Sequence, residues 1–194
     1  MILDEAALAV KKELTNKRYE HTLRVVDEAT KLAHNYGANV DDVQLSAMFH
    51  DYAKDMDKQF LRDKIMTSDL SNDLLNYHEE LWHGPVASVL VEERFHIRNK
   101  GIQSAIKYHT TGKQAMSVVD EIVFLADYIE PERSFPAVAE VREHAYKDLT
   151  FACWLVCRNN IHHLTSKRAL IHPDTLHAYN DLTRKLSTKY MEGN

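Results

Sequence analysis

The sequence predicts an all-α fold in which a single domain is built as a helical bundle. Helical periodicity runs through most of the 194 residues, and the alternating pattern of an exposed sheet is missing. The chain has only 5 Gly and 4 Pro, too few for the many tight turns of a sheet-rich protein. Apolar residues make up 44% and charged residues 27%, which are globular values. We therefore expect one compact domain over residues 1–194.

Capping residues, glycine and proline delimit the expected helices. Asn16 is expected to cap the second helix, and Asp41 the third, which runs through Ala53. The Gly84-Pro85 pair opens a later helix, because proline suits the first helical turn. In chain order, we expect helices at 4–14, 16–36, 41–53, 57–66, 71–79, 84–95, 99–109, 117–130, 137–147, 150–168 and 174–190.

Four of these helices carry a marked apolar stripe at helical spacing. The residues on those stripes are His21, Val25, Ala29, Leu32 and Tyr36, then Leu45, Met48, Phe49 and Tyr52, then Ile102, Ala105, Ile106 and His109, and finally Val119, Ile122, Val123 and Ala126. Two of the stripes therefore include a histidine, which is not a usual core residue.

The charge balance and the absence of long apolar runs narrow the classes of partner. The chain has 24 basic and 29 acidic residues, a net charge of −5, which argues against a large nucleic-acid footprint. No apolar run reaches the roughly 18 residues of a membrane span, and the first residues lack the order of a signal peptide. We expect a cytoplasmic protein, with neither nucleic acid nor membrane as partner. Cys153 and Cys157, four apart in an expected helix, are expected to be buried and reduced.

A set of histidines and aspartates stands at positions where solvent-facing side chains are not expected. A single histidine on a core face is more often a hydrogen-bonded core residue than a metal ligand, but a buried, unpaired aspartate is costly and needs a partner. Each member is expected near the middle or end of its own helix, so a bundle can bring them all to one centre. The set, in chain order, is His21, His50, Asp51, His83, His109 and Asp127. The other eight of the 12 histidines, His162 and His163 included, are expected in surface or capping roles.

With these six residues in this order, the chain resembles the HD-domain phosphohydrolases, and more closely the YqeK-type symmetrical bis(5′-nucleosyl)-tetraphosphatases. An HD dipeptide alone is weak evidence, whereas HDYAK, HTTG and ADYIEP in this order and at these separations are specific. The matching stretches are RYEHTLRV (18–25), AMFHDYAKD (47–55), WHGPVAS (82–88), AIKYHTTGKQAMS (105–117) and FLADYIEPER (124–133). They indicate an HD-type fold whose metal-site core covers about 18–133, followed by C-terminal helices at about 137–190.

The resemblance implies a di-iron site. By that analogy, His21, His50, Asp51 and Asp127 bind one metal ion, His83 and His109 bind the second, and Asp51 bridges the two. The residue types agree with such a centre, because imidazole and carboxylate without thiolate suit Fe, Mn, Co or Zn. Composition alone does not select iron among these divalent ions.

A phosphate substrate also needs cationic or hydrogen-bonding groups close to the metals. Lys54 follows the His50-Asp51 pair by about one helical turn, and Arg133 follows Asp127 past the helix end. We expect Asp51, Lys54 and Arg133 to be catalytic, with Arg133 as the phosphate clamp, since a guanidinium can donate two parallel hydrogen bonds. The expected substrate-binding residues are Arg18, Arg24, Lys54, Thr110, Thr111, Gly112 and Arg133. For each of them, a solvated charge or a plain turn is the alternative.

The function that the resemblance implies is hydrolysis of diadenosine tetraphosphate and related dinucleoside polyphosphates. A hydroxide held by the metals would attack one inner phosphorus, and the symmetrical cut would release two ADP. Two alternatives share the same residues: another HD hydrolase acting on nucleoside mono- or triphosphates or on guanosine alarmones, and a non-catalytic sensor of nucleotide or metal. The sequence leaves open whether the chain is a monomer or a homodimer.

Overall fold

Helices carry most of the backbone. The computed structural model describes residues 1–192 and, within that range, holds ten α-helices, two 3-10 helices and no strand. In chain order they are α1 (Leu3–Glu13), α2 (Asn16–Tyr36), α3 (Val40–Phe49), α4 (Lys58–Thr67), η1 (Asn72–Asn76), η2 (Glu79–Leu81), α5 (His83–Phe95), α6 (Lys100–Tyr108), α7 (Val118–Ile129), α8 (Val138–His144), α9 (Leu149–Ser166) and α10 (Pro173–Glu192). The all-α prediction is confirmed. Residues 193–194, the last two of the expected domain, lie outside the described residues.

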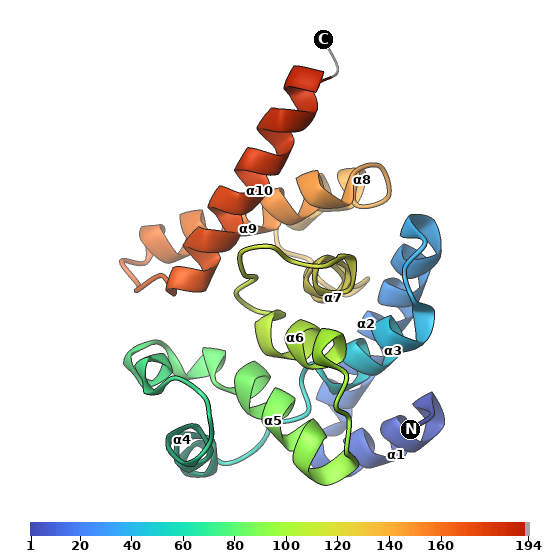
Figure 1. Ribbon diagram of the computed structural model, residues 1–194, viewed down its shortest axis with the longest axis vertical. Helices are drawn as coiled ribbons and strands as arrows, with labels where there is room; N and C mark the ends of the chain where they lie inside the picture. Colours follow the sequence, from blue (N-terminus) through green and yellow to red (C-terminus); the bar gives the residue numbers. More distant parts are fainter. Residues whose placement is uncertain (193–194) are drawn as a thin grey trace.

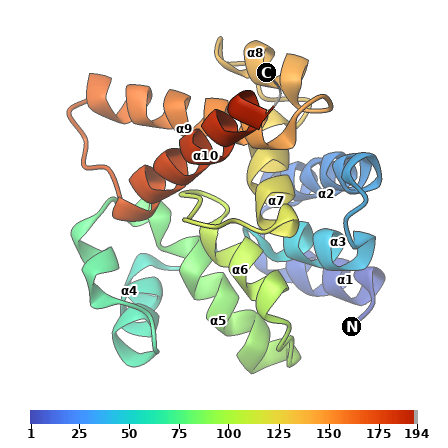
Figure 2. The same cartoon turned by 45° about the horizontal axis from the view of Figure 1, so that its top comes forward.

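Helix α7 lies at the centre of the arrangement. It contacts α2, α3 and α6, and also α8 and α9 (Figure 1). Residues 122–126 of α7 are all buried, as expected of a helix that is apolar on every side. Helix α10 packs on α9, while α4 lies at the far end of the molecule, beside α5 (Figure 2). A polar residue near the C-terminal end of α7, such as Asp127, is therefore surrounded by the other helices of the bundle.

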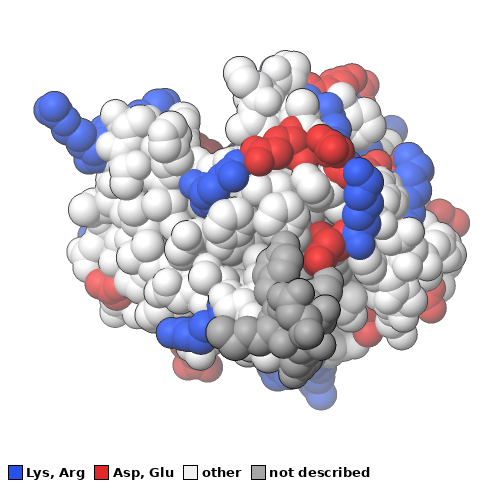
Figure 3. All heavy atoms as spheres, turned by 90° about the horizontal axis from the view of Figure 1, so that it is seen from above, with Lys and Arg blue, Asp and Glu red and all other residues white. Residues whose placement is uncertain are grey.

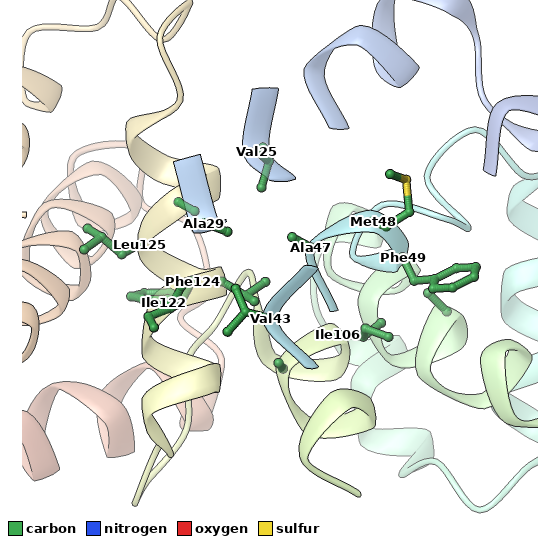
Figure 4. Packing of buried hydrophobic residues seen from close by; sticks show 14 of the residues in the cluster. Val25, Ala29, Val43, Ala47, Met48, Phe49, Ile106, Ile122, Phe124 and Leu125 are labelled. Carbon is green, nitrogen blue, oxygen red and sulfur yellow. The ribbon is translucent and has the colours of Figure 1, made fainter. Parts of the chain in front are cut away.

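The apolar core fixes how the central helices meet. Figure 4 shows buried apolar side chains of α2, α3, α6 and α7, among them Val25, Phe49, Ile106 and Leu125, of which Leu125 points to the side of α7 away from α3. None of these four side chains is exposed to solvent. Burial of each such side chain stabilises the fold by about 1.5–3 kcal/mol. Five of the six residues of the histidine and aspartate set lie on these four helices or within two residues of their ends.

Two helices begin at a different capping residue from the one expected. The Thr15 hydroxyl, not Asn16, accepts the Arg18 backbone N–H, at 3.4 Å. Asn39 Oδ1, not Asp41, accepts the Asp42 backbone N–H, at 3.0 Å. In each case two residues of good capping type stand close together and the earlier one is used, so Asn16 and Asp41 lie in the first turn of their helices.

The third helix was expected to continue to Ala53, but it ends at Phe49. The Nδ1 of His50 contacts the Ala47 carbonyl at 2.6 Å, and this is the carbonyl that a continuing helix would offer to Asp51. From there to residue 56 the backbone forms tight turns, with the Lys54 N–H donating to the Asp51 carbonyl at 2.8 Å. The expectation that Lys54 lies one helical turn beyond the His50-Asp51 pair is therefore wrong.

The segment 71–79, expected as one helix, forms the two 3-10 helices instead. The His78 side chain accepts the Glu80 backbone N–H at 3.2 Å and so starts a new turn. The remaining expected helices agree with the structure to within about three residues at each end. Cys153 and Cys157 are free and buried, as expected.

On the face shown in Figure 3, uncharged side chains cover most of the surface, and basic and acidic side chains are interspersed among them. Among the described residues, no helix has both the length and the apolar character needed to cross a membrane.

Candidate metal centre

The structure brings all six histidine and aspartate residues of the set together. His21 lies in α2, His50 and Asp51 follow α3, His109 follows α6, and Asp127 lies near the end of α7. His83 is the first residue of α5, so the expectation that every member lies near the middle or end of a helix is wrong for it. All six are buried except Asp127, whose side chain is 19% exposed.

Asp51 occupies the middle of this centre. Its Oδ2 lies 3.4 Å from Nε2 of His50 and 3.7 Å from Nε2 of His21. Its Oδ1 lies 3.0 Å from Nε2 of His83 and 3.8 Å from Nε2 of His109. The two oxygens of one carboxylate therefore face two different pairs of imidazoles.

Asp127 closes one side of the centre. Its Oδ1 lies 3.1 Å from Nε2 of His21, and one ligand atom each of His21, His50 and Asp127 fall within 4.8 Å of one another. A second group with the same spacing consists of His50, Asp51 and His109. Each group has enough donor atoms in reach of one point to hold a metal ion.

In each imidazole, Nδ1 points away from the centre and Nε2 points into it. The contact that Nδ1 makes determines whether Nε2 is a donor or an acceptor. In three of the four histidines, Nδ1 contacts the backbone carbonyl of the residue three positions earlier: Ala47 for His50 at 2.6 Å, Glu80 for His83 at 2.7 Å and Ile106 for His109 at 2.8 Å. A carbonyl cannot donate, so Nδ1 must carry the hydrogen, and Nε2 of the neutral ring presents a lone pair. The hydrogen-bonded outer nitrogen is the usual arrangement of metal-binding histidines.

The inner atoms therefore face one another as acceptors without a donor between them. Nε2 of His83 and Nε2 of His109 are 3.0 Å apart. Nε2 of His21 and Nε2 of His50 are buried without a hydrogen-bond partner in the part of the chain that the structure describes. Buried lone pairs without a partner are costly, and a cation would satisfy them. The donor set thus fits the divalent metal binding that imidazole and carboxylate ligands favour.

The charges of the centre agree with that fit. Burial opposes ionisation of Asp51, but its contacts with His50 and His83 outweigh burial and hold the pKa of Asp51 well below its usual range. Burial, together with the charges of His83 and His50, lowers the pKa of His109 to about 3. Burial also opposes charge on His50, yet the neighbouring Asp51 carboxylate raises the pKa of His50. A metal ion that binds Nε2 of His50 would displace the proton that the charged imidazole carries on this atom.

Glu130, which the sequence analysis did not single out, supports His21 from outside the centre. Its Oε1 lies 3.3 Å from Nδ1 of His21, and its Oε2 accepts the Arg24 Nε–H at 2.7 Å. Glu130 caps the end of α7, three residues after Asp127, and is buried. A carboxylate one turn beyond Asp127 at the end of an apolar helix was the signal in the sequence that could have identified it.

Arg142, also missed, fastens the segment between α7 and α8. Its guanidinium donates to the backbone carbonyls of Ile129 at 2.9 Å, Glu130 at 2.6 Å and Arg133 at 3.0 Å. This segment carries both Glu130 and Arg133. Nothing in the sequence marks Arg142, because its partners are backbone atoms.

The four cations expected near a phosphate are all within this region, but each is paired with a carboxylate. Arg18 Nη1 lies 2.9 Å from Asp51 Oδ2, and Arg133 Nη2 lies 2.7 Å from Asp127 Oδ1. Arg18 and Arg133 thus contact the centre itself. Lys54 Nζ lies 2.6 Å from Glu80 Oε2, and Arg24 is held by Glu130 and by Glu132, the latter at 3.0 Å.

The residues 110–112 differ from one another in their surroundings. The Thr110 hydroxyl is buried without a hydrogen-bond partner in the described part of the chain. The Thr111 hydroxyl donates to the Gly112 carbonyl at 2.8 Å. Gly112 has φ +66°, and a Cβ there would approach the Ala178 Cβ to 2.9 Å, so only glycine fits this turn.

A pocket of about 600 Å³ opens beside the centre. Its lining includes His109 and Asp127 of the centre, Thr110 and Arg133 next to it, and residues of α9. The sequence left open whether the C-terminal helices line the site, and α9 does so. His162 and His163, expected in surface or capping roles, are part of that lining.

The HD domain family matches residues 18–132 of this chain. A protein of Halalkalibacterium halodurans named symmetrical bis(5′-nucleosyl)-tetraphosphatase is 43% identical over 178 residues, which cover 92% of this chain and 95% of that protein. A protein of Bacillus subtilis with the same name is 38% identical over 177 residues, covering 91% of this chain and 95% of that protein.

A solved structure has the same fold. A crystal structure from Clostridium acetobutylicum, described as a predicted HD superfamily hydrolase involved in NAD metabolism, superimposes with a TM-score of 0.88. The two chains are 30% identical, and the match covers 94% of this chain and 97% of the other.

Proposed function

This chain belongs to the HD-domain family, and on that premise we propose that it hydrolyses dinucleoside polyphosphates, cutting diadenosine tetraphosphate symmetrically into two ADP. Two relatives that share 43% and 38% of their aligned residues with it, over most of its length, carry the name of this activity. The observation in the chain itself that supports hydrolysis at a metal centre is the position of Asp51, whose two oxygens face two separate pairs of imidazoles.

We further propose that two divalent ions occupy the centre, with Asp51 bridging them. One ion would take His21, His50 and Asp127, which lie close enough together to share it. The other would take His83 and His109, whose inner nitrogens are 3.0 Å apart. Iron is proposed from the family resemblance, and the ligands also suit Mn, Co or Zn.

The chemistry that such ions supply when bound is a lowered pKa of water and polarisation of a phosphoryl oxygen. The chain itself orients the four imidazoles through their Nδ1 contacts and keeps Asp51 and Asp127 ionised. Two carboxylates offset only part of the charge of two divalent ions, so the centre attracts the polyphosphate of the substrate. Arg18 and Arg133, which contact Asp51 and Asp127, are proposed to donate hydrogen bonds to phosphoryl oxygens, and so are Lys54 and the Thr110 hydroxyl.

A protein nucleophile is not required by this proposal, and the cysteines do not offer one. Burial raises the pKa of Cys157 to about 12 and holds that of Cys153 well above its usual value. A thiol so far from ionisation is a poor nucleophile at neutral pH.

A product assay tests the proposed function. Purified, metal-loaded protein is incubated with a panel of nucleotides, and the products are separated by chromatography. With diadenosine tetraphosphate, ADP should be the only nucleotide product. Equal amounts of AMP and ATP would mean an asymmetrical cut and would contradict the proposal. So would an inert dinucleotide together with rapid turnover of a nucleoside monophosphate, which would indicate another HD hydrolase.

A further inference from the structure

The pocket beside the metal centre has one charged end. This end is formed by Asp127 and Arg133, where charged groups of the centre lie. The rest of the lining includes the aromatic side chains of Tyr128 and Phe135 and several residues of α9, most of them polar. A nucleotide likewise has a charged phosphate chain, joined to a flat, uncharged base. The volume of about 600 Å³ lies in the range of small-molecule sites.

The aromatic wall is formed by two rings in edge-to-face contact. The centroids of Tyr128 and Phe135 are 4.9 Å apart, with an angle of 80° between the ring planes. Phe135 lies in the connector before α8 and is 36% exposed, a high value for a phenylalanine. An exposed phenylalanine at the edge of a pocket offers a surface for a flat ligand to cover.

One face of α9 also lines the pocket. Val156, Asn159, Asn160 and His163 follow one another at the spacing i, i+3, i+4, i+7, and all four line the pocket. The two asparagines differ in what they do. Asn159 donates to the Tyr128 hydroxyl at 3.3 Å and accepts from the Arg158 guanidinium at 3.0 Å, so its amide is engaged on both sides. None of the hydrogen bonds found among the described residues involves the Asn160 amide.

We infer that this pocket binds one nucleoside of the substrate, with the base stacked on Phe135 and its polar edge hydrogen-bonded to the Asn160 amide. The inference rests on the proposed function, since it extends that function to the part of the substrate beyond the phosphates. An amide offers a donor and an acceptor side by side, which matches the N6 amino group and N1 of adenine. Asn159 and Tyr128 hold the wall in place and leave Asn160 available for the ligand.

Comparing ADP with pyrophosphate separates this inference from the proposed function. Both ligands present a diphosphate to the metal centre, but only ADP carries a nucleoside. Binding of each to the metal-loaded protein is measured by calorimetry. The parent should bind ADP about 10-fold or more tightly than pyrophosphate, by the contribution of a stacked base.

Phe135→Ala should remove about 10-fold of that advantage and leave pyrophosphate affinity unchanged. Phe60→Ala is the matched control, because Phe60 on α4 is 37% exposed but lines none of the pockets found beside the centre. This control variant should bind both ligands as the parent does.

Asn160→Asp tests the edge contact independently of stacking. A carboxylate offers acceptors only, which suits the N1–H and amino group of guanine better than the edge of adenine. The ratio of ADP to GDP affinity should therefore fall, by about 10-fold, while pyrophosphate binding is retained.

The outcomes are distinct. The inference would be overturned by equal affinity of the parent for ADP and pyrophosphate, by an ADP advantage that survives Phe135→Ala, or by an ADP-to-GDP affinity ratio that is unchanged in Asn160→Asp. Symmetrical cleavage would then still stand. Absence of both pyrophosphate binding and hydrolysis would instead contradict the proposed function.

Discussion

At the scale of single residues, the hydrogen bonds made by Nδ1 of each histidine orient the imidazoles of the centre. Three imidazoles use Nδ1 to hold a carbonyl of the preceding helical turn, and the fourth uses it to hold Glu130. The inner nitrogens are then free to face Asp51. Gly84 makes room for this, because a Cβ there would lie 3.1 Å from the ring of His109. Small and polar neighbours thus determine the position of the six proposed ligands.

Substitutions of Arg133 distinguish a direct contact with the phosphate from a structural role. Arg133→Ala should lower kcat/KM by about 30- to 1000-fold, or about 2–4 kcal/mol, if the guanidinium stabilises charge on the phosphoryl oxygens. Arg133→Lys keeps the charge but loses the planar fork, so it should be intermediate. Steady-state kinetics on the dinucleotide measure both variants.

Metal content, measured on the same samples, decides how Arg133 acts. Because its guanidinium lies 2.7 Å from Asp127, it could also serve by orienting that carboxylate. Unchanged metal with reduced kcat/KM supports the phosphate clamp. Loss of metal in proportion to activity would make Arg133 a positioning residue, and turnover equal to the parent would make it a solvated charge on a connector.

The order of histidines and aspartates along the chain predicted which six residues meet, because all six lie on helices of the bundle or directly beside a helix end. The same reasoning could not find Glu130 or Arg142. Glu130 reaches His21 across 109 positions of sequence, and Arg142 bonds only to backbone carbonyls. Contacts of that kind depend on how helices pack, which the pattern of one helix does not encode.

At the scale of helices, the positions at which helices end place more of the proposed ligands than the middles of helices do. His50 and His109 each stand at the residue after a helix, where the last carbonyls have no partner within the helix. Periodicity predicted that these helices exist but not that α3 stops at Phe49, because the residues up to Ala53 keep an apolar pattern. The side chain of His50 competes with the backbone there, and the turn that results places Asp51 among the histidines.

The segment between α7 and α8 depends on Arg142. Arg142→Met removes three hydrogen bonds to its carbonyls and should destabilise the fold by about 1–3 kcal/mol. It should also weaken metal retention, because the segment carries Glu130 and Arg133. Thermal unfolding and metal content after dialysis are the two measurements. Arg142→Lys keeps one donor group and should recover part of both, whereas full metal retention by Arg142→Met would refute this role.

In the whole molecule, α10 is joined to the central helix by an ion pair between a buried carboxylate and a partly exposed lysine. The Oε1 of Glu121 in α7 lies 3.3 Å from the Nζ of Lys185 in α10. Burial raises the pKa of Glu121, and the ion pair only partly offsets it. The folded form therefore holds the proton more tightly than the unfolded chain. That contribution to stability is present below the unfolded pKa and is lost as pH rises through the folded pKa.

Glu121→Gln removes this titration, so its effect on stability should depend on pH. Thermal unfolding of parent and variant is compared from about pH 4, near the unfolded pKa of glutamate, to about pH 8. The melting temperature of Glu121→Gln minus that of the parent should increase as pH rises. Titrations common to both proteins cancel in this difference, and a difference independent of pH would contradict the burial argument.

Asp51 is proposed to join two metal ions in one phosphohydrolase centre. Metal content and ADP formation, measured together on the parent and on Asp51→Asn, test it most directly. Asp51→Asn should keep the helical fold, bind less metal and form almost no ADP from diadenosine tetraphosphate, because a bridging carboxylate serves both ions. An Asp51→Asn protein with full metal content and normal turnover would contradict the two-metal account.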